Sequence, residues 1–335
     1  MKQMAASQPD TKPRKIIFEY HKNLEEEVVA LLPAYNPAKQ LCSRARIDPE
    51  HRNWLCDGTF DAVPLIFEQL FTVHVIKQGK NLIINLCIIY EQTRSDLTKF
   101  FNIVKSKVKN NPLSVYSDYE LAIINSIKEI FPEADVFGCY FHLKKSIWRH
   151  IQSIGLAAKY SDLSLKDNLI RKYSKMLACL AFVPVDYVID AFEEVQSLIP
   201  NELKKVYTYF EDNYIGAKKR TKVSSQKTPR FSLELWNCYE RTKEGLPRTN
   251  NYLEGWHNAL QSTIKSHPHL LSLIDSLKPE QSNTENVYIK PRTGQVNKRK
   301  AVYMKLEEQI TTFVNNFNRE KVVEYLNNLS LLIEY

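Results

Sequence analysis

The chain has 335 residues, 44% of them hydrophobic, which is enough to bury a sizeable core and more than one small domain needs. Its formal charge of +8 favours a polyanionic partner such as nucleic acid, although a solvated surface explains a charge surplus equally well. Six scattered cysteines exclude a small disulfide-stapled domain, and neither a secretory leader nor an apolar run of membrane-spanning length is visible. We therefore expect a soluble intracellular protein with reduced thiols.

The first part of the chain predicts a poorly folded segment followed by three strands. Residues 1–15 are polar and expected to be disordered, and a helix is predicted over residues 23–32. Strands are predicted where the sequence alternates or is almost wholly apolar, over residues 53–60, 71–77 and 82–90. The polar turn QGKN before the third strand predicts a hairpin.

Helices and strands then alternate along the chain. The spacing of apolar residues predicts helices over residues 96–108, 119–130 and 142–155. Two short strands are predicted between these helices, over residues 113–116 and 134–140. A hairpin joined to strand–helix crossovers gives the α/β class, with a mixed sheet that carries helices on its faces.

The rest of the chain is predicted to be almost entirely helical. Period-two patterning disappears between residues 161 and 244, where helices are predicted over residues 169–181, 185–197 and 201–214. Later helices are predicted over residues 249–266, 300–316 and 319–333, with a polar basic loop at 279–299. The expected parts are an N-terminal segment (1–50), the first part of the core (51–160), an all-helical insertion (161–244) and the completion of the core (245–335).

Three acidic residues stand out because of the elements that carry them. Asp57 lies within an apolar strand, Asp118 at the carboxyl end of the fourth strand, and Glu254 near the start of a helix. An unpaired carboxylate inside a sheet is costly to bury, so it needs a partner or a metal ion. Two cations about 4 Å apart, held by such carboxylates, clamp the oxygens of a phosphoryl transfer. We expect the three carboxylates to converge on a shared metal site.

Each acid also has a plain structural explanation. Asp118 is a favourable N-cap for the helix that follows it, and Asp57 before Gly58 is typical of a turn. Glu254 could complete a capping box in which Asn251 is the N-cap. The joint arrangement of the three acids, rather than any one of them, favours the metal site.

Cys139 and His142 form a C-x-x-H motif at the end of the fifth predicted strand. Its spacing is that of half a zinc site. No second C-x-x-C or H-x-x-x-H completes the site, and the remaining candidates are isolated: Cys179, Cys238, His150 and His257. A buried cysteine followed by a histidine at the start of a helix explains the motif as well.

Basic side chains gather in three places. One predicted helix carries Lys144, Lys145 and Arg149 directly after the C-x-x-H motif. A loop of the helical stretch carries Lys218, Lys219, Arg220, Lys222, Lys227 and Arg230. The C-terminal loop carries Lys290, Arg292, Lys298, Arg299 and Lys300. These clusters would neutralise DNA phosphates and make binding salt-dependent, although each could equally be a solvated face.

Together these motifs resemble the Mutator-like (MULE) transposases. The similarity is carried by WLCDGTFDAVPLIFEQLFTVHVI, VYSDYELAIINSIKEIFPEADVFGCYFHLKKSIWRHI and RTNNYLEGWHNALQSTI, within residues 53–269. The resemblance implies an RNase H-like core that a helical insertion interrupts before the last acid. It also implies that Asp57, Asp118 and Glu254 are the catalytic, metal-binding triad. Cys139 and His142 match the family's C-x-x-H signature, with an expected structural or DNA-contacting role.

The resemblance further implies a nuclear enzyme that uses Mg²⁺ or Mn²⁺ to cleave DNA at transposon ends and join it to target DNA. The expected partners are these DNAs, with a second copy of the chain as a further candidate and no membrane. Family members often carry an upstream zinc-binding module of FLYWCH or WRKY-like type. We expect none here, because about fifty residues precede the core and hold one cysteine, Cys42.

Two other functions fit the same sequence. A transposon-derived protein could retain the fold and bind DNA or protein without catalysis, although all three acids are present. An RNase H-like nuclease unrelated to transposition is disfavoured by the C-x-x-H motif and by the long insertion. DNA cleavage in the presence of metal separates the enzyme from the binding protein.

Overall fold

The computed structural model describes residues 52–77, 80–89, 93–164, 167–216, 228–289 and 301–333. The segment predicted over residues 1–50, with its disorder and its helix, lies outside the described residues. The chain forms two compact units. The sheet unit comprises Met1–Val115, Leu121–Asp135 and Tyr252–Val296. The helical unit comprises Tyr116–Glu120, Val136–Asn251 and Asn297–Tyr335.

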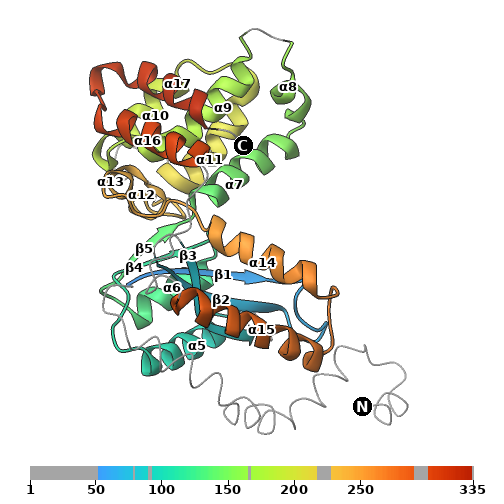
Figure 1. Ribbon diagram of the computed structural model, residues 1–335. Helices are drawn as coiled ribbons and strands as arrows, with labels where there is room; N and C mark the ends of the chain where they lie inside the picture. Colours follow the sequence, from blue (N-terminus) through green and yellow to red (C-terminus); the bar gives the residue numbers. More distant parts are fainter. Residues whose placement is uncertain are drawn as a thin grey trace. The chain divides into compact units, whose positions relative to one another are not determined.

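The described strands form one mixed sheet of five, in the order β3-β2-β1-β4-β5 (Figure 1). They are β1 (Asn53–Thr59), β2 (Gln69–Lys77), β3 (Lys80–Ile89), β4 (Ser114–Ser117) and β5 (Asp135–Gly138). β2 pairs antiparallel with both β1 and β3. The antiparallel pairing of β2 with β3 confirms the predicted hairpin, and the mixed sheet with its helices confirms the α/β class.

The described helices of the sheet unit are α5 (Arg94–Lys107), α6 (Leu121–Ile130), α14 (Asn251–Thr263) and α15 (Leu270–Ile289). Three of them confirm, within one turn at each end, the helices predicted over residues 96–108, 119–130 and 249–266. α5 begins where the Thr93 side chain accepts a hydrogen bond from the backbone N–H of Asp96 at 3.2 Å. Such a cap supplies a partner for one of the N–H groups that the first turn leaves without one.

The pairing register decides which side chains of β1 and β2 face which helix. Asp57 lies directly opposite Thr72, so both side chains point to the same face of the sheet. α14 covers that face, since His257 Nε2 lies 3.2 Å from the Thr72 hydroxyl. Neighbouring strand residues point to opposite faces. Phe71 accordingly faces the other way and packs edge-to-face on Phe100 of α5, with 5.5 Å between ring centroids.

The prediction of a loop over residues 279–299 is wrong for its first part, because α15 continues through Pro279. The prediction rested on the polar and basic composition of this stretch. Leu273 is fully buried in an apolar cluster before Pro279. Trp256 Nε1 donates to the carboxylate of Glu280, directly after it, at 2.8 Å. Contacts on both sides of the proline thus hold α15 against the sheet unit; the remainder of the predicted loop lies outside the described residues.

The helical unit contains no strand in the described part of residues 161–244. Its α-helices are α7 (Tyr140–Ser153), α8 (Ala157–Ser161), α9 (Leu169–Cys179), α10 (Val188–Gln196), α11 (Lys204–Phe210), α12 (Leu233–Trp236), α13 (Tyr239–Lys243), α16 (Ala301–Asn315) and α17 (Val322–Leu332). Shorter turns are η2 (Leu180–Phe182), η3 (Val185–Tyr187), η4 (Asn201–Leu203), η5 (Glu211–Ile215) and η7 (Arg319–Lys321). Within the described residues, no helix combines the length and apolar character that crossing a membrane requires.

Aromatic rings form the centre of the helical unit. The Tyr214 ring stacks on Phe210 at 4.9 Å and on Phe231 at 5.5 Å between centroids. Trp236 Nε1 donates to the backbone oxygen of Tyr214 at 3.0 Å. The Tyr214 hydroxyl also forms a hydrogen bond with Ser146 of α7 at 2.8 Å. Large rings bury much apolar area and fix their neighbours, so this cluster holds α7 in place.

Candidate functional site

Asp57 lies inside β1, and its relative exposure is 8%. Its Oδ1 accepts a hydrogen bond from the backbone N–H of Gly58 at 2.9 Å. Gly58 has no Cβ. The side-chain amide of Gln69 lies close to where a Cβ at this position would be. Both residues of the DG pair belong to the strand, so the turn explanation for Asp57 is wrong.

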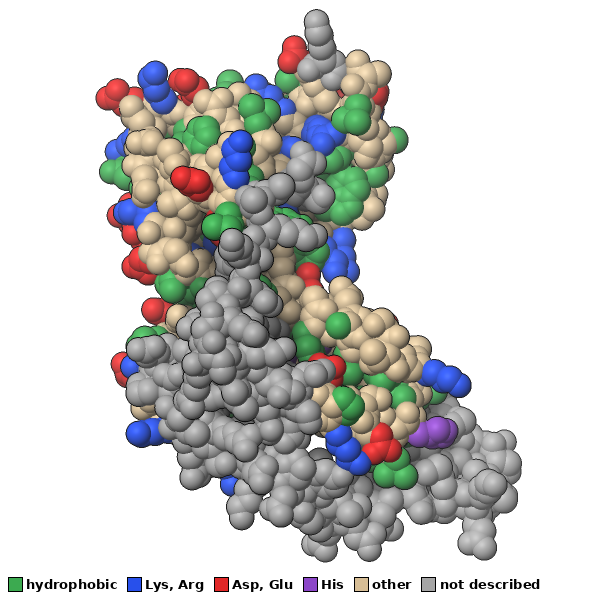
Figure 2. Space-filling view, in the orientation of Figure 1, with side chains coloured by type: hydrophobic (Ala, Val, Ile, Leu, Met, Phe, Trp, Pro, Cys, Tyr) green, Lys and Arg blue, Asp and Glu red, His purple; other side chains and the backbone are tan. Residues whose placement is uncertain are grey.

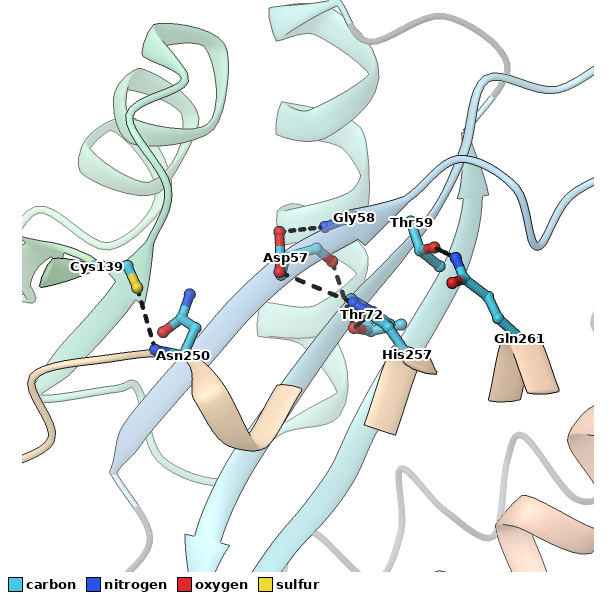
Figure 3. Close-up of polar contacts among 8 residues, drawn as sticks. All are labelled: Asp57, Gly58, Thr59, Thr72, Cys139, Asn250, His257 and Gln261. Atoms are coloured by element: carbon cyan, nitrogen blue, oxygen red, sulfur yellow. Dashed lines mark hydrogen bonds and ion pairs between the residues drawn. The ribbon is translucent and has the colours of Figure 1, made fainter. Parts of the chain in front are cut away.

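His257 of α14 lies beside Asp57 on the same face of the sheet (Figure 3). The Thr72 hydroxyl donates to the backbone oxygen of Asp57 at 3.3 Å and lies 3.2 Å from His257 Nε2. Burial lowers the pKa of His257 to about 4, so its ring is neutral at pH 7. Which of Thr72 and Nε2 is the donor in this contact depends on which ring nitrogen of His257 carries the hydrogen.

His257 Nδ1 lies 3.8 Å from Asp57 Oδ2. A carboxylate and a neutral imidazole, both groups that bind metal ions, thus lie next to each other in a buried place. Glu254 precedes His257 by one turn of α14 and is half-buried. Residues three apart share one face of a helix, so Glu254 and His257 lie on the same side of α14.

α14 is positioned by contacts that the sequence did not reveal. It begins at Asn251, which places Asn250 at the N-cap position, so the capping box with Asn251 does not fit. Gln261 Nε2 donates to Thr59 Oγ1 of β1 at 2.6 Å. Sequence reasoning missed both Thr72 and Gln261. A signal for Thr72 was present, because it is a polar residue within the apolar run of its strand.

Asp118 belongs to the helical unit and directly follows β4. Its Oδ1 accepts a hydrogen bond from the backbone N–H of Glu120 at 3.4 Å, which closes a turn. α6 begins only at Leu121, so Asp118 does not occupy the N-cap position. Burial raises the pKa of Asp118 to about 6, and hydrogen bonds with Glu120 oppose this effect.

The convergence of Asp57, Asp118 and Glu254 stays a prediction. Asp57 and Glu254 belong to the sheet unit, and Asp118 belongs to the helical unit. Among the residues that the structure describes, no three His, Cys, Asp or Glu side chains gather as the ligands of one ion. Asp57, Glu254 and His257 all belong to the sheet unit, and the contact between Asp57 and His257 is measured within it.

The raised pKa of Asp118 predicts a pH-dependent effect of its replacement. The folded state binds the Asp118 proton more tightly than the unfolded chain, so this carboxyl contributes less to stability as the pH rises through about 6. In EDTA, Asp118→Asn should raise the free energy of unfolding at pH 7.5 by about 1–3 kcal/mol, and by much less at pH 4.5. Urea titrations at several pH values measure the difference. The exposed Asp135→Asn is the control, and an equal pH trend in both variants would contradict the prediction.

A cavity of about 480 Å³ opens beside Asp118 within the helical unit. We name it the α7 cavity. Its lining residues are Asp118, Tyr119, Glu120, His142, Lys145, Ser146, Arg149, His150, Ser153 and Tyr209. Volumes of roughly 300–1,000 Å³ are typical of sites for small ligands. Sequence reasoning missed Ser153 and Tyr209 as neighbours of Asp118, because they come near it only through the packing of the helical unit.

The two members of the C-x-x-H motif have different surroundings. Cys139 is a buried free thiol whose sulfur accepts a hydrogen bond from the backbone N–H of Asn250 at 3.2 Å (Figure 3). Cys139 thereby holds the chain segment that leads into α14. His142 lines the α7 cavity instead. Burial, followed by the charges of Lys145 and Arg149, lowers the pKa of His142 to about 4.

The predicted basic clusters are only partly described. Lys145 and Arg149 line the α7 cavity, whereas the Lys144 ammonium lies 5.7 Å from the centre of the Tyr140 ring. The Arg230 guanidinium carbon lies 5.4 Å from the centre of the Phe231 ring. The other predicted DNA-contacting residues lie outside the described residues: Lys218, Lys219, Arg220, Lys222, Lys227, Lys290, Arg292, Lys298, Arg299 and Lys300. On the face in Figure 2, the blue Lys and Arg side chains of the helical unit are interspersed with red Asp and Glu side chains. The described residues on that face therefore form no broad basic patch.

Comparison with known families agrees with the motifs. Residues 53–146 match the family model of the MULE transposase domain. The matched segment contains Asp57, Asp118, Cys139 and His142, and Glu254 lies beyond it. No curated protein matches the sequence. The segment of residues 53–146 is thus similar to the MULE transposase domain, and this similarity indicates a transposase-related function.

Proposed function

We propose that the chain is the catalytic part of a Mutator-like transposase with an RNase H-like core. Asp57, Asp118 and Glu254 would bind the metal ions that promote DNA cleavage and strand transfer. The observation that carries the proposal is the buried carboxylate of Asp57 inside β1, within the segment that matches the transposase domain. The strand order, with the β1–β3 meander next to β4 and β5, also supports such a core.

The donor groups suit Mg²⁺ or Mn²⁺, which prefer carboxylate oxygens. Asp57 Oδ2 lies 3.8 Å from His257 Nδ1, so a carboxylate and an imidazole are available as neighbouring ligands of one cation. Burial disfavours the charged form of Asp118, which a nearby cation would restore. When bound, the ions would stabilise charge on the phosphate oxygens and activate the attacking group. The protein residues hold and orient these ions, and His257 keeps Asp57 in place on β1 through Thr72.

The similarity to a transposase domain implies interaction with DNA. We extend this to transposon ends and target DNA as substrates, and to the nucleus as the place of action. Strand transfer joins two element ends to one target, so a second copy of the chain is a proposed partner.

The test is a strand-cleavage assay with the full chain and DNA that carries the terminal inverted repeats flanking its coding sequence. Parallel reactions contain Mg²⁺, Mn²⁺ or EDTA. We expect nicks at the repeat ends with either metal and none in EDTA. DNA binding without nicking in either metal would contradict the enzyme and favour a transposon-derived binding protein.

A further inference from the structure

One face of α7 forms the largest part of the α7 cavity wall. The residues on this face are His142, Lys145, Ser146, Arg149, His150 and Ser153. Successive residues of this set are three residues or one residue apart in the sequence, which places them on one side of a helix. Every member is polar, whereas Leu143, Ile147 and Ile151 on the opposite side of α7 are fully buried. α7 is thus anchored by its apolar side and presents a polar face to the cavity.

Two permanent positive charges lie on this face. Lys145 and Arg149 are one turn apart and exposed. Among the described residues, neither forms an ion pair with a carboxylate. Like charges at this spacing repel each other, so a bound anion would relieve the repulsion. Arginine offers paired N–H donors that match the oxygens of a phosphate.

The remaining walls are held in place by the helical unit. The His150 ring stacks on Tyr209 of α11, with 4.3 Å between centroids and 11° between planes. Ser146 is tied to Tyr214 in the aromatic centre. A wall fixed before binding loses little entropy when a ligand enters. Asp118 and Glu120 also line the cavity, so its lining includes both basic and acidic residues.

We propose that the α7 cavity binds a backbone phosphate of the DNA strand, with Lys145 and Arg149 as its charge partners. His142 lines the cavity one turn before Lys145. The lining also contains a proposed metal ligand, Asp118, so a phosphate bound here would lie beside the proposed metal site. The inference rests on the proposed function, because it assigns a role in DNA binding to residues beside that ligand.

The test measures DNA binding without catalysis. A fluorescent single-stranded oligonucleotide is titrated with the full chain in EDTA at several salt concentrations, and anisotropy gives the affinity. The double variant Lys145→Ala/Arg149→Ala should bind about tenfold or more weakly, with a salt slope smaller by about 0.7–1.4. The matched control is Lys204→Ala/Lys205→Ala, which removes two exposed charges from α11 outside the cavity lining. We expect a much smaller change in that control.

Equal losses in both double variants would show a general charge effect and overturn the site. Parent-like binding by the cavity variant would also overturn it. Inorganic phosphate shares this chemistry, so it should displace the oligonucleotide better than chloride does, but only at concentrations far above that of the oligonucleotide phosphates. Displacement at comparable concentrations would assign the cavity to free phosphate instead of DNA. Thermal midpoints near that of the parent establish that the variants are folded.

This experiment and the cleavage assay can fail separately. If the parent nicks repeat DNA and the cavity variant binds DNA as the parent does, the proposed phosphate site is wrong, but the proposed transposase activity is supported. If DNA binding depends on Lys145 and Arg149 but no metal supports nicking, the phosphate site is supported and the proposed activity is wrong.

Discussion

Asp57→Asn should reduce DNA cleavage at least about a thousandfold, because metal ligation contributes several kcal/mol and each factor of ten corresponds to about 1.4 kcal/mol. The substitution keeps the shape of the side chain and removes the charge that would hold the cation. Oδ1 can still accept the hydrogen bond from Gly58, so β1 should keep its structure. DNA affinity should stay close to that of the parent, because lysines and arginines elsewhere supply it.

The matched control is Asp61→Asn, four residues along the chain, where the carboxylate is exposed. It should nick DNA at the parent rate. Single-turnover nicking, thermal midpoint and salt-dependent DNA affinity are measured for the parent and both variants. Equal nicking by parent and Asp57→Asn would show that Asp57 is not a metal ligand. Equal losses in the two variants would point to an effect of net charge rather than of the site.

Much of the sheet unit was predictable because its local signals agree with its packing. The apolar run of β1, the hairpin of β2 and β3, and the helical period of α5 each appear directly in the sequence. Asp57 was visible as a charge inside such an apolar run. α15 was not predictable beyond Pro279, since its stability depends on the burial of Leu273 and on the contact between Trp256 and Glu280. Local propensity contains no information about such contacts.

The surroundings of the site residues were less accessible to sequence reasoning. The contact of Thr72 with His257 joins positions 185 residues apart, and the α7 cavity combines three separate chain segments. The C-x-x-H spacing indicated a joint role for Cys139 and His142. The structure instead places the sulfur against the segment before α14 and the imidazole in the cavity. A shared motif does not require a shared function.

Arg241 is a buried charge that no sequence signal marked. Its relative exposure is 3%, and its guanidinium donates to the backbone oxygen of Gly138 at 3.1 and 3.2 Å. It also donates to the backbone oxygen of Trp236 at 3.3 Å and to the sulfur of Cys238 at 3.0 Å. The Phe137 ring centre lies 5.0 Å from the guanidinium carbon. Arg241 therefore links the end of β5 to α12 and α13 by satisfying carbonyls that water does not reach.

Arg241→Met should lower the free energy of unfolding by about 2–5 kcal/mol, since each unsatisfied buried carbonyl costs about 1–3 kcal/mol. Methionine retains most of the apolar stem, so the loss reports the missing hydrogen bonds. The control is Arg319→Met. The Arg319 guanidinium also contacts the Tyr187 ring and the Asp190 carboxylate, but it is exposed. Removal of that surface pair should cost less than about 1 kcal/mol. Urea unfolding gives the magnitudes, and amide hydrogen exchange should locate the loss of protection in α7, α12 and α13 while β1 to β3 keep theirs. Equal destabilisation by both variants would show that burial of Arg241 adds nothing to the stability of the helical unit.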